Sequence, residues 1–222
     1  MRAKILLLFS ALLVIASIAM DFLLVPSETG STLMQHNPVF YLHIPVSWIA
    51  LTGFLVVFIA GIAYLKTRRI FWDRVGSAAA ELGLLFTTFL LLTGSIWGRA
   101  EWGIWWDWDA RLTSSLVLWI IYMGYFLLRA YVSEPGQRAR FSAIFGIIGF
   151  VDVPIVILSL FVSRRIHPGG EAFKLSEPGM IVTLVLGVVA YSLLFLALML
   201  IRLRLKEGAW EIARLKELKG EE

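Results

Sequence analysis

Cysteine is absent from this chain of 222 residues. Its absence excludes disulfides, thiolate metal ligands, redox dithiols and any C-x-x-C-H attachment sequence. The dipeptide Gly-Lys is also absent, which excludes the phosphate-binding loop of P-loop ATPases, so any use of ATP falls to a partner. Charge is scarce, because Asp, Glu, Lys and Arg make up 16% of the chain against about 25% in soluble domains. These absences argue against a compact soluble enzyme, and no catalytic residues are predicted.

Apolar residues, by contrast, make up 59% of the chain, and its mean hydropathy is +0.81. They fall into six blocks, each near the 20 or so residues that a helix needs to cross a hydrocarbon core of about 30 Å. The runs are unbroken and do not alternate, which favours helices over barrel strands. The predicted fold is all-α, a polytopic membrane protein with six transmembrane helices. These are Ile5–Val25, Val39–Leu65, Val75–Trp97, Leu112–Val132, Phe141–Ser163 and Gly179–Ile201.

Lysine and arginine are unequally divided between the two sides of this bundle. Fifteen of the 20 lie on the side of the chain ends, so the positive-inside rule predicts that both termini are cytoplasmic. The same asymmetry explains the pI near 9.5, so membrane lipid is expected as a partner and nucleic acid is not. Residues 1–201 then form the membrane bundle, and residues 202–222 form a cytoplasmic amphipathic tail. The outward loops are residues 26–38, 98–111 and 164–178.

The first block has two interpretations. Arg2 and Lys4 precede an apolar run, and Ser17-Ile18-Ala19 resembles the small-residue cleavage site of a signal peptide. The run continues to Val25, however, which is longer than a usual signal core. We therefore expect an uncleaved helix.

Tryptophan is concentrated in the second outward loop, where four of nine occur within seven positions. One interpretation is an aromatic belt, since Trp gathers at membrane interfaces, although a belt scatters its tryptophans over many helix ends. A short interfacial helix over residues 102–111 would instead place three of them and Asp109 on one face, as a flat shelf. Arg99 and Arg111 flank this shelf and suit carboxylates. The loop tryptophans are Trp102, Trp105, Trp106 and Trp108.

The three histidines also fall on or near the outward side. His43 lies at the outer end of the second span, His167 lies in the last outward loop, and His36 is interpreted as a solvated loop residue. Imidazole is a common axial ligand of haem iron, and a planar, dianionic haem fits an aromatic shelf flanked by arginines. Zinc fits less well, because cysteine and a close H-x-x-x-H spacing are both missing. The pattern therefore predicts haem iron held by His43 and His167.

Two stretches of the sequence match a known pattern. The run WGIWWDWDARLT, from Trp102 to Thr113, resembles the tryptophan-rich WWD signature of a haem-handling protein family. With the six spans, the chain length and the stretch YLHIP around His43, it is similar to the cytochrome c maturation protein C (CcmC) family. The chain departs from the family pattern at Asp107 and Asp152, where relatives usually carry uncharged residues.

The resemblance implies a function in c-type cytochrome biogenesis. Family members collect haem b at the outer (periplasmic) face of the bacterial inner membrane and deliver it to the haem chaperone CcmE. Their two outward histidines are axial ligands, which carries over to His43 and His167, and their WWD loop presents the haem edge. They work beside the ABC-type transporter subunits CcmA and CcmB and the small single-span subunit CcmD. The missing ATP-binding loop agrees with that division of labour.

Two other functions stay open from the residues alone. One is a transporter that moves haem across the bilayer, for which the spans supply few polar groups. The other is a structural subunit of an ABC-type complex, in which the tryptophans serve only as anchors. Two acids lie inside the spans, Glu81 and Asp152. Because charge at bilayer depth is costly, both are interpreted as protonated or hydrogen-bonded groups that fix helix packing, Asp152 with help from Pro154.

Overall fold

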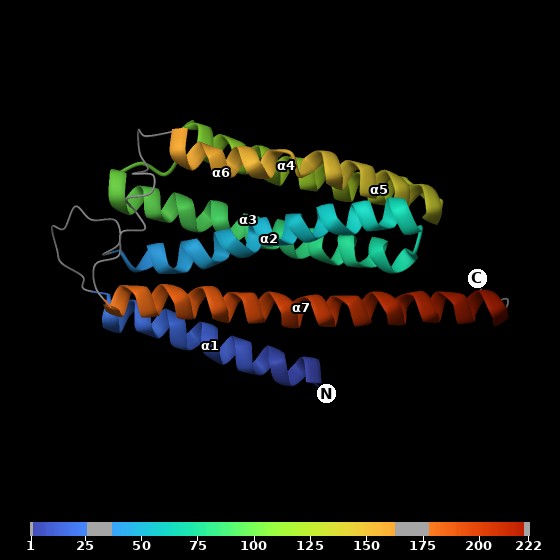
Figure 1. The fold of residues 1–222 in the computed structure, drawn as a ribbon, viewed down its shortest axis with the longest axis horizontal. Coiled ribbons are helices and arrows are strands. Elements are labelled where there is room, and N and C mark those ends of the chain that lie inside the picture. Colours follow the sequence, from blue (N-terminus) through green and yellow to red (C-terminus); the bar gives the residue numbers. More distant parts are fainter. Residues whose placement is uncertain (1, 26–36, 163–177, 220–222) are drawn as a thin grey trace.

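A computed structural model describes residues 2–25, 37–162 and 178–219, and every regular element in these ranges is a helix (Figure 1). Six stretches are long and apolar enough to cross a membrane, with α5 and α6 sharing one of them, Pro135–Ser159. The prediction of an all-α polytopic fold with six spans is confirmed. The helices are α1 Arg2–Leu24, α2 Pro38–Thr67, α3 Ile70–Trp102, α4 Ala110–Tyr131, α5 Pro135–Gly149, α6 Asp152–Val162 and α7 Pro178–Lys219.

Side-chain caps determine where two of the helices begin. Asn37 precedes Pro38, and its side-chain oxygen accepts the backbone N–H of Val39 at 3.0 Å. Glu134 precedes Pro135 and accepts the backbone N–H groups of Gly136 and Gln137, which lower the pKa of its carboxyl. Proline suits the first helical position, because its missing donor has no intrahelical partner there.

The helices form three rows, with α2 and α3 in the centre (Figure 1). The helices α1 and α7 pack along each other on one side, while α4, α5 and α6 lie on the other. Both chain ends point toward the end of the bundle where α2 turns into α3. The core between the central and outer rows is mainly aliphatic and includes stacked aromatic rings: the ring of Phe54 on α2 stacks on Tyr122 of α4 at 3.8 Å between centroids.

The fifth predicted span differs from the structure. One continuous helix over Phe141–Ser163 is wrong, because the chain turns at Phe150 and Val151 between α5 and α6. Val153 donates its N–H to the Phe150 carbonyl at 3.0 Å, a tighter pattern than an α-helix makes. Pro154 explains the break, since it has no N–H and its ring excludes the carbonyl four residues earlier. Asp152, which is buried, therefore begins a helix.

The last helix is longer than its predicted span. It runs unbroken from Pro178 to Lys219, so the tail continues the helix that crosses the membrane. Glu81 of α3 holds this helix in place, as the structural interpretation of this acid expected. Its carboxylate accepts Arg202 Nε at 2.6 Å and Lys206 Nζ at 2.7 Å, and Nζ also donates to Ser77 Oγ at 3.0 Å. These bonds tie α3 to α7 near the end where the termini lie.

Candidate functional site

The tryptophan-rich segment is a loop, and the predicted helix over residues 102–111 is wrong. Helix α3 continues to Trp102 and ends at Gly103, whose φ of 74° lies in the left-handed region that favours glycine. The N–H of Gly103 bonds to the Arg99 carbonyl at 3.2 Å. Residues 103–109 form no helix, and α4 begins at Ala110. The tryptophans are therefore presented by an irregular segment and do not share one helical face.

Asp109 determines where α4 begins. Its side chain is buried, and its Oδ1 accepts the backbone N–H of Leu112 at 2.8 Å. This is the N-cap arrangement that satisfies one of the free donors of a first helical turn. Asp109, the second acid of the WWDWD run at residues 105–109, therefore has a structural role: it ends the loop and starts α4.

His43 projects from α2 toward α3 and is only 4% exposed. Its Nδ1 lies 2.9 Å from the hydroxyl oxygen of Thr93, and that hydroxyl donates its proton to the Phe89 carbonyl at 2.7 Å. Since a hydroxyl carries one proton, its oxygen accepts from Nδ1–H. We assign the proton of the neutral imidazole to Nδ1 on this basis, which leaves the lone pair on Nε2.

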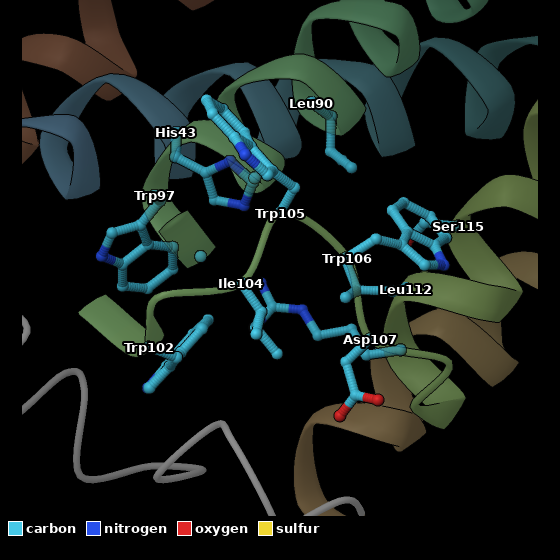
Figure 2. Close-up of a pocket in the computed structure, with 13 residues that line it drawn as sticks. His43, Leu90, Trp97, Trp102, Ile104, Trp105, Trp106, Asp107, Leu112 and Ser115 are labelled. Atoms are coloured by element: carbon cyan, nitrogen blue, oxygen red, sulfur yellow. The ribbon is translucent and has the colours of Figure 1, made fainter. Parts of the chain in front are cut away.

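The imidazole is held in place by α3. A Cβ at Gly94 would lie 3.2 Å from His43 Cε1, so any side chain there would press on the ring. The ring of Trp97, which is 2% exposed, lies 5.5 Å from the imidazole and also contacts Phe40 and Trp102. Figure 2 shows Trp97 and Trp102 on one side of Ile104 and Trp106 on the other. The orientation of His43 is thus determined by packing and by one hydrogen bond.

The tryptophans divide into buried and exposed members. Trp105 and Trp108 are 60% and 74% exposed, so each presents an open ring face. The guanidinium of Arg99 lies 6.0 Å above the ring of Trp105 and also donates to the Gly103 carbonyl. The indole N–H of Trp106 is buried and meets no acceptor among the described residues, while its ring meets Trp108 edge-on at 5.7 Å. The segment therefore offers both apolar faces and an unused donor.

A cavity lies between this loop and the helices beneath it. Its volume is about 30 Å³, enough for a water molecule but far below the several hundred Å³ of a site for a large organic ligand. A macrocycle does not fit inside it, so in this arrangement such a ligand can lie only on the exposed tryptophan faces above, and contact with His43 requires the loop to move. Lining residues from the predicted site are His43, Trp102, Trp105, Trp106 and Arg111, joined by Asp107 and Trp97.

The structure thus brings together five of the nine predicted site residues around one cavity. Arg99, Trp108 and Asp109 belong to the same loop region but do not line it. His167 and His36 lie outside the described residues, as does nearly all of the loop 164–178. Thr93 and Gly94 were missed, because in sequence they are ordinary small residues of an apolar span. Only the packing of α3 on α2 places them at His43.

The fold and this site define a polytopic helical membrane protein with a tryptophan-rich loop over a buried histidine at one end of its bundle. The chain belongs to the CcmC family, whose model, described as heme exporter protein C, matches residues 2–216.

Individual relatives carry matching names. "Heme exporter protein C" of Bradyrhizobium diazoefficiens is 33% identical over 170 residues, 75% of this chain and 65% of the relative. The protein of the same name from Rhodobacter capsulatus is 30% identical over 199 residues, 87% of this chain and 80% of the relative. A "putative cytochrome c biosynthesis ccmC-like mitochondrial protein" of Marchantia polymorpha is 32% identical over 165 residues, 74% of this chain and 69% of the relative. The chain thus spans about two thirds of the length of the first relative.

Proposed function

We propose that this chain binds haem b as a transient ligand at the tryptophan-rich end of the bundle, for c-type cytochrome biogenesis. The observation that carries the proposal is the setting of His43, whose Nδ1 is held by Thr93 so that Nε2 carries the lone pair. Metal-ligating histidines commonly donate their other ring N–H in this way, which fixes the tautomer. The names of the relatives, heme exporter protein C, support the choice of ligand.

The remaining residues suit a flat ligand with two carboxylates. The open faces of Trp105 and Trp108 stack against the macrocycle, and Arg111 and Arg99 pair with its propionates. The indole N–H of Trp106, which meets no acceptor among the described residues, supplies a further donor. Bound haem offers iron to two ligands, for which we propose His43 and His167. Because His43 lines a closed cavity, its ligation requires the loop above it to move aside. Asp109 contributes indirectly, by capping α4 below the loop.

We further propose that the tryptophan-rich end faces the periplasm of the bacterial inner membrane and that both termini are cytoplasmic. The distribution of lysine and arginine supports this orientation. Haem held against exposed rings keeps an edge accessible, which suits delivery to the chaperone CcmE. CcmA and CcmB would supply ATP hydrolysis, which a chain without a P-loop cannot perform, and CcmD would complete the complex.

Visible absorption spectra of the purified protein, oxidised and dithionite-reduced, test the ligand pair. We expect the wild type to show a low-spin spectrum with two imidazole ligands, and both His43→Ala and His167→Ala to weaken it strongly. His36→Ala is the matched control, because it removes the third histidine, and it should leave the spectrum unchanged. A full spectrum in His43→Ala, or no haem in the wild type when haem is supplied, would overturn the proposal.

Delivery is tested separately from binding. Loaded protein mixed with CcmE should lose its haem to the chaperone, and loaded His36→Ala should do the same. Sealed vesicles supplied with haem on one side distinguish capture at the outer face from transport through the chain. Loading from the periplasmic side alone is expected, and any loading from the cytoplasmic side would contradict capture at the outer face alone and favour a transporter.

A further inference from the structure

A second and larger cavity lies at the opposite end of the bundle, where the chain ends point (Figure 1). Its volume is about 510 Å³, and its walls come from the first turns of α3 and α5, the last turn of α4 and the second half of α7. Nothing in the proposed function uses it. We call it the cationic cavity, after the five cations among its lining residues. These are Arg74, Arg129, Arg138, Lys206 and Arg214.

The positive charge of this cavity is only partly neutralised. Asp73 is the one acid among its described lining residues, and it is engaged by Arg129 through two bonds of 2.6 and 3.1 Å. Lys206 is shared with Glu81 of α3. The other three guanidiniums, those of Arg74, Arg138 and Arg214, form no ion pair with any residue that the structure describes. Glu134 interacts electrostatically with Arg138 without forming an ion pair, so Arg74 and Arg214 are the least compensated. The cavity walls keep a net positive charge, which attracts an anion.

Two of these guanidiniums are held by an aromatic ring. The Cζ of Arg74 lies 4.8 Å from the ring centroid of Trp210, and that of Arg214 lies 5.6 Å from it. Cation–π contact keeps both planar groups beside the cavity without consuming their hydrogen-bond donors. Guanidinium matches phosphate oxygens in a bidentate manner. The chemistry of the walls therefore suits a phosphate group.

The depth of the cavity indicates where such a phosphate comes from. About 20 helical residues cross the hydrocarbon core, so from Trp97 at the tryptophan-rich end of α3 the opposite edge falls near Ser77. Ser77 lines the cationic cavity, which therefore lies level with the headgroup layer. Trp210 in its wall is also typical of membrane interfaces. Basic pockets between helices at this level bind the headgroups of anionic lipids.

We propose that the cationic cavity binds the phosphate of an anionic phospholipid headgroup, held by Arg74, Arg138 and Arg214. The lipid neutralises the end of the bundle where α3, α4, α5 and α7 meet and links α7 to the others. The site is separate from the haem proposal and does not depend on it.

Native mass spectrometry of the full chain in neutral detergent tests the site, with phosphatidylglycerol and phosphatidylcholine as probes. We expect the wild type to retain phosphatidylglycerol preferentially. The triple variant Arg74→Gln, Arg138→Gln, Arg214→Gln should lower its retention about tenfold or more.

The matched control is Arg69→Gln, Arg140→Gln, Arg204→Gln, which removes three exposed charges from the same end without touching the cavity walls. It should lower retention much less. Should the cavity triple variant not fold, Arg138→Gln alone serves, since it leaves the packing of Arg74 and Arg214 on Trp210 in place.

Three outcomes would overturn this proposal. Equal losses in the two triple variants would mean that surface charge alone attracts the lipid. Equal retention of both lipids by the wild type would mean that the cavity does not select a charged headgroup. Saturable binding of inorganic phosphate that displaces phosphatidylglycerol would assign the cavity to a soluble phosphate compound instead. None of these results bears on the haem spectrum, so failure here is distinguishable from failure of the proposed function.

Discussion

The two ends of this bundle are organised in opposite ways. At the tryptophan-rich end the side chains pack on one another and leave a cavity of about 30 Å³, whereas the cationic cavity at the other end has about 510 Å³. Indole rings attract one another and fill space, while like charges stay apart and leave space open. A large ligand at the first end therefore lies against exposed ring faces unless the loop moves away from His43, whereas a ligand at the second can enter between helices.

The first prediction concerns the ion pair in the wall of the cationic cavity. Asp73→Asn removes the carboxylate that engages Arg129 in a pair whose side chains are 9% and 15% exposed. Removing one partner of a buried ion pair typically costs about 3–5 kcal/mol, because the other charge is left uncompensated. This pair is only partly buried, so we place its cost at or below the lower end of that range. We expect a loss of that size in the free energy of unfolding, measured by denaturant titration of the purified protein.

The double variant Asp73→Asn, Arg129→Met is the control for this effect. It removes both charges, so it should recover a large part of the loss. A double variant as unstable as Asp73→Asn would mean that the pair matters through shape and not through charge.

The second prediction separates two tryptophans of the opposite end. Trp97 is 2% exposed and supports His43, so Trp97→Ala should cost about 3–5 kcal/mol in unfolding free energy. Trp108 is 74% exposed, so Trp108→Ala should change stability by about 0.5 kcal/mol or less. Loss of one stacking face should nevertheless weaken haem binding roughly two- to tenfold. Titration of haem into both variants measures this, and a destabilised Trp108→Ala with normal haem binding would reverse the two assignments.

Much of this contrast could be predicted from sequence, but not all of it. The spans, the clustered tryptophans and the excess of cations at one end follow from composition and from spacing along the chain. The loop geometry did not, since the spacing of Trp102, Trp105 and Trp106 matches a helical face. Gly103, with its left-handed φ, and the capping of α4 by Asp109 override that pattern. These two local features, and not the helical spacing of the tryptophans, determine the structure of the segment.

Other features depend on contacts between distant segments. The break before Asp152 had a local signal in Pro154, although its position in the fold did not. The cationic cavity is lined by residues of α3, α4, α5 and α7, so no single stretch of the sequence predicts it. Thr93 reaches His43 from 50 positions away. Such features require the packing of helices and are absent from hydrophobic patterns.

The third prediction concerns Thr93 as a positioning residue for His43. Thr93→Val keeps the shape of the side chain but removes the oxygen that accepts Nδ1–H, so the imidazole loses its preferred tautomer. Loss of such a partner lowers metal affinity about 10–100-fold, and we expect a decrease in that range for haem, measured by absorption titration. Thr93→Ser retains the hydroxyl and should restore binding. If Val and Ser bind haem alike, Thr93 acts through packing alone.

The smallest expected effect concerns Asp109, where two explanations of a motif acid compete. As the N-cap of α4, Asp109 accepts one backbone N–H, and replacing such a cap by Ala costs about 1 kcal/mol. Asn caps helices as well as Asp does, so Asp109→Asn should keep both stability and the slow hydrogen exchange of the Leu112 amide, while Asp109→Ala should lose both. An acid that instead contacted haem or its propionate partner through its charge would give another result, namely reduced haem binding in Asp109→Asn with exchange at Leu112 unchanged. One carboxylate oxygen caps Leu112, and the charge of Asp109 also interacts with Arg111. If the cap is its main role, Asp109→Asn behaves as the wild type, which is the result we expect. Asp109 would then stabilise the loop and the start of α4, whereas the tryptophans and His43 would bind the ligand.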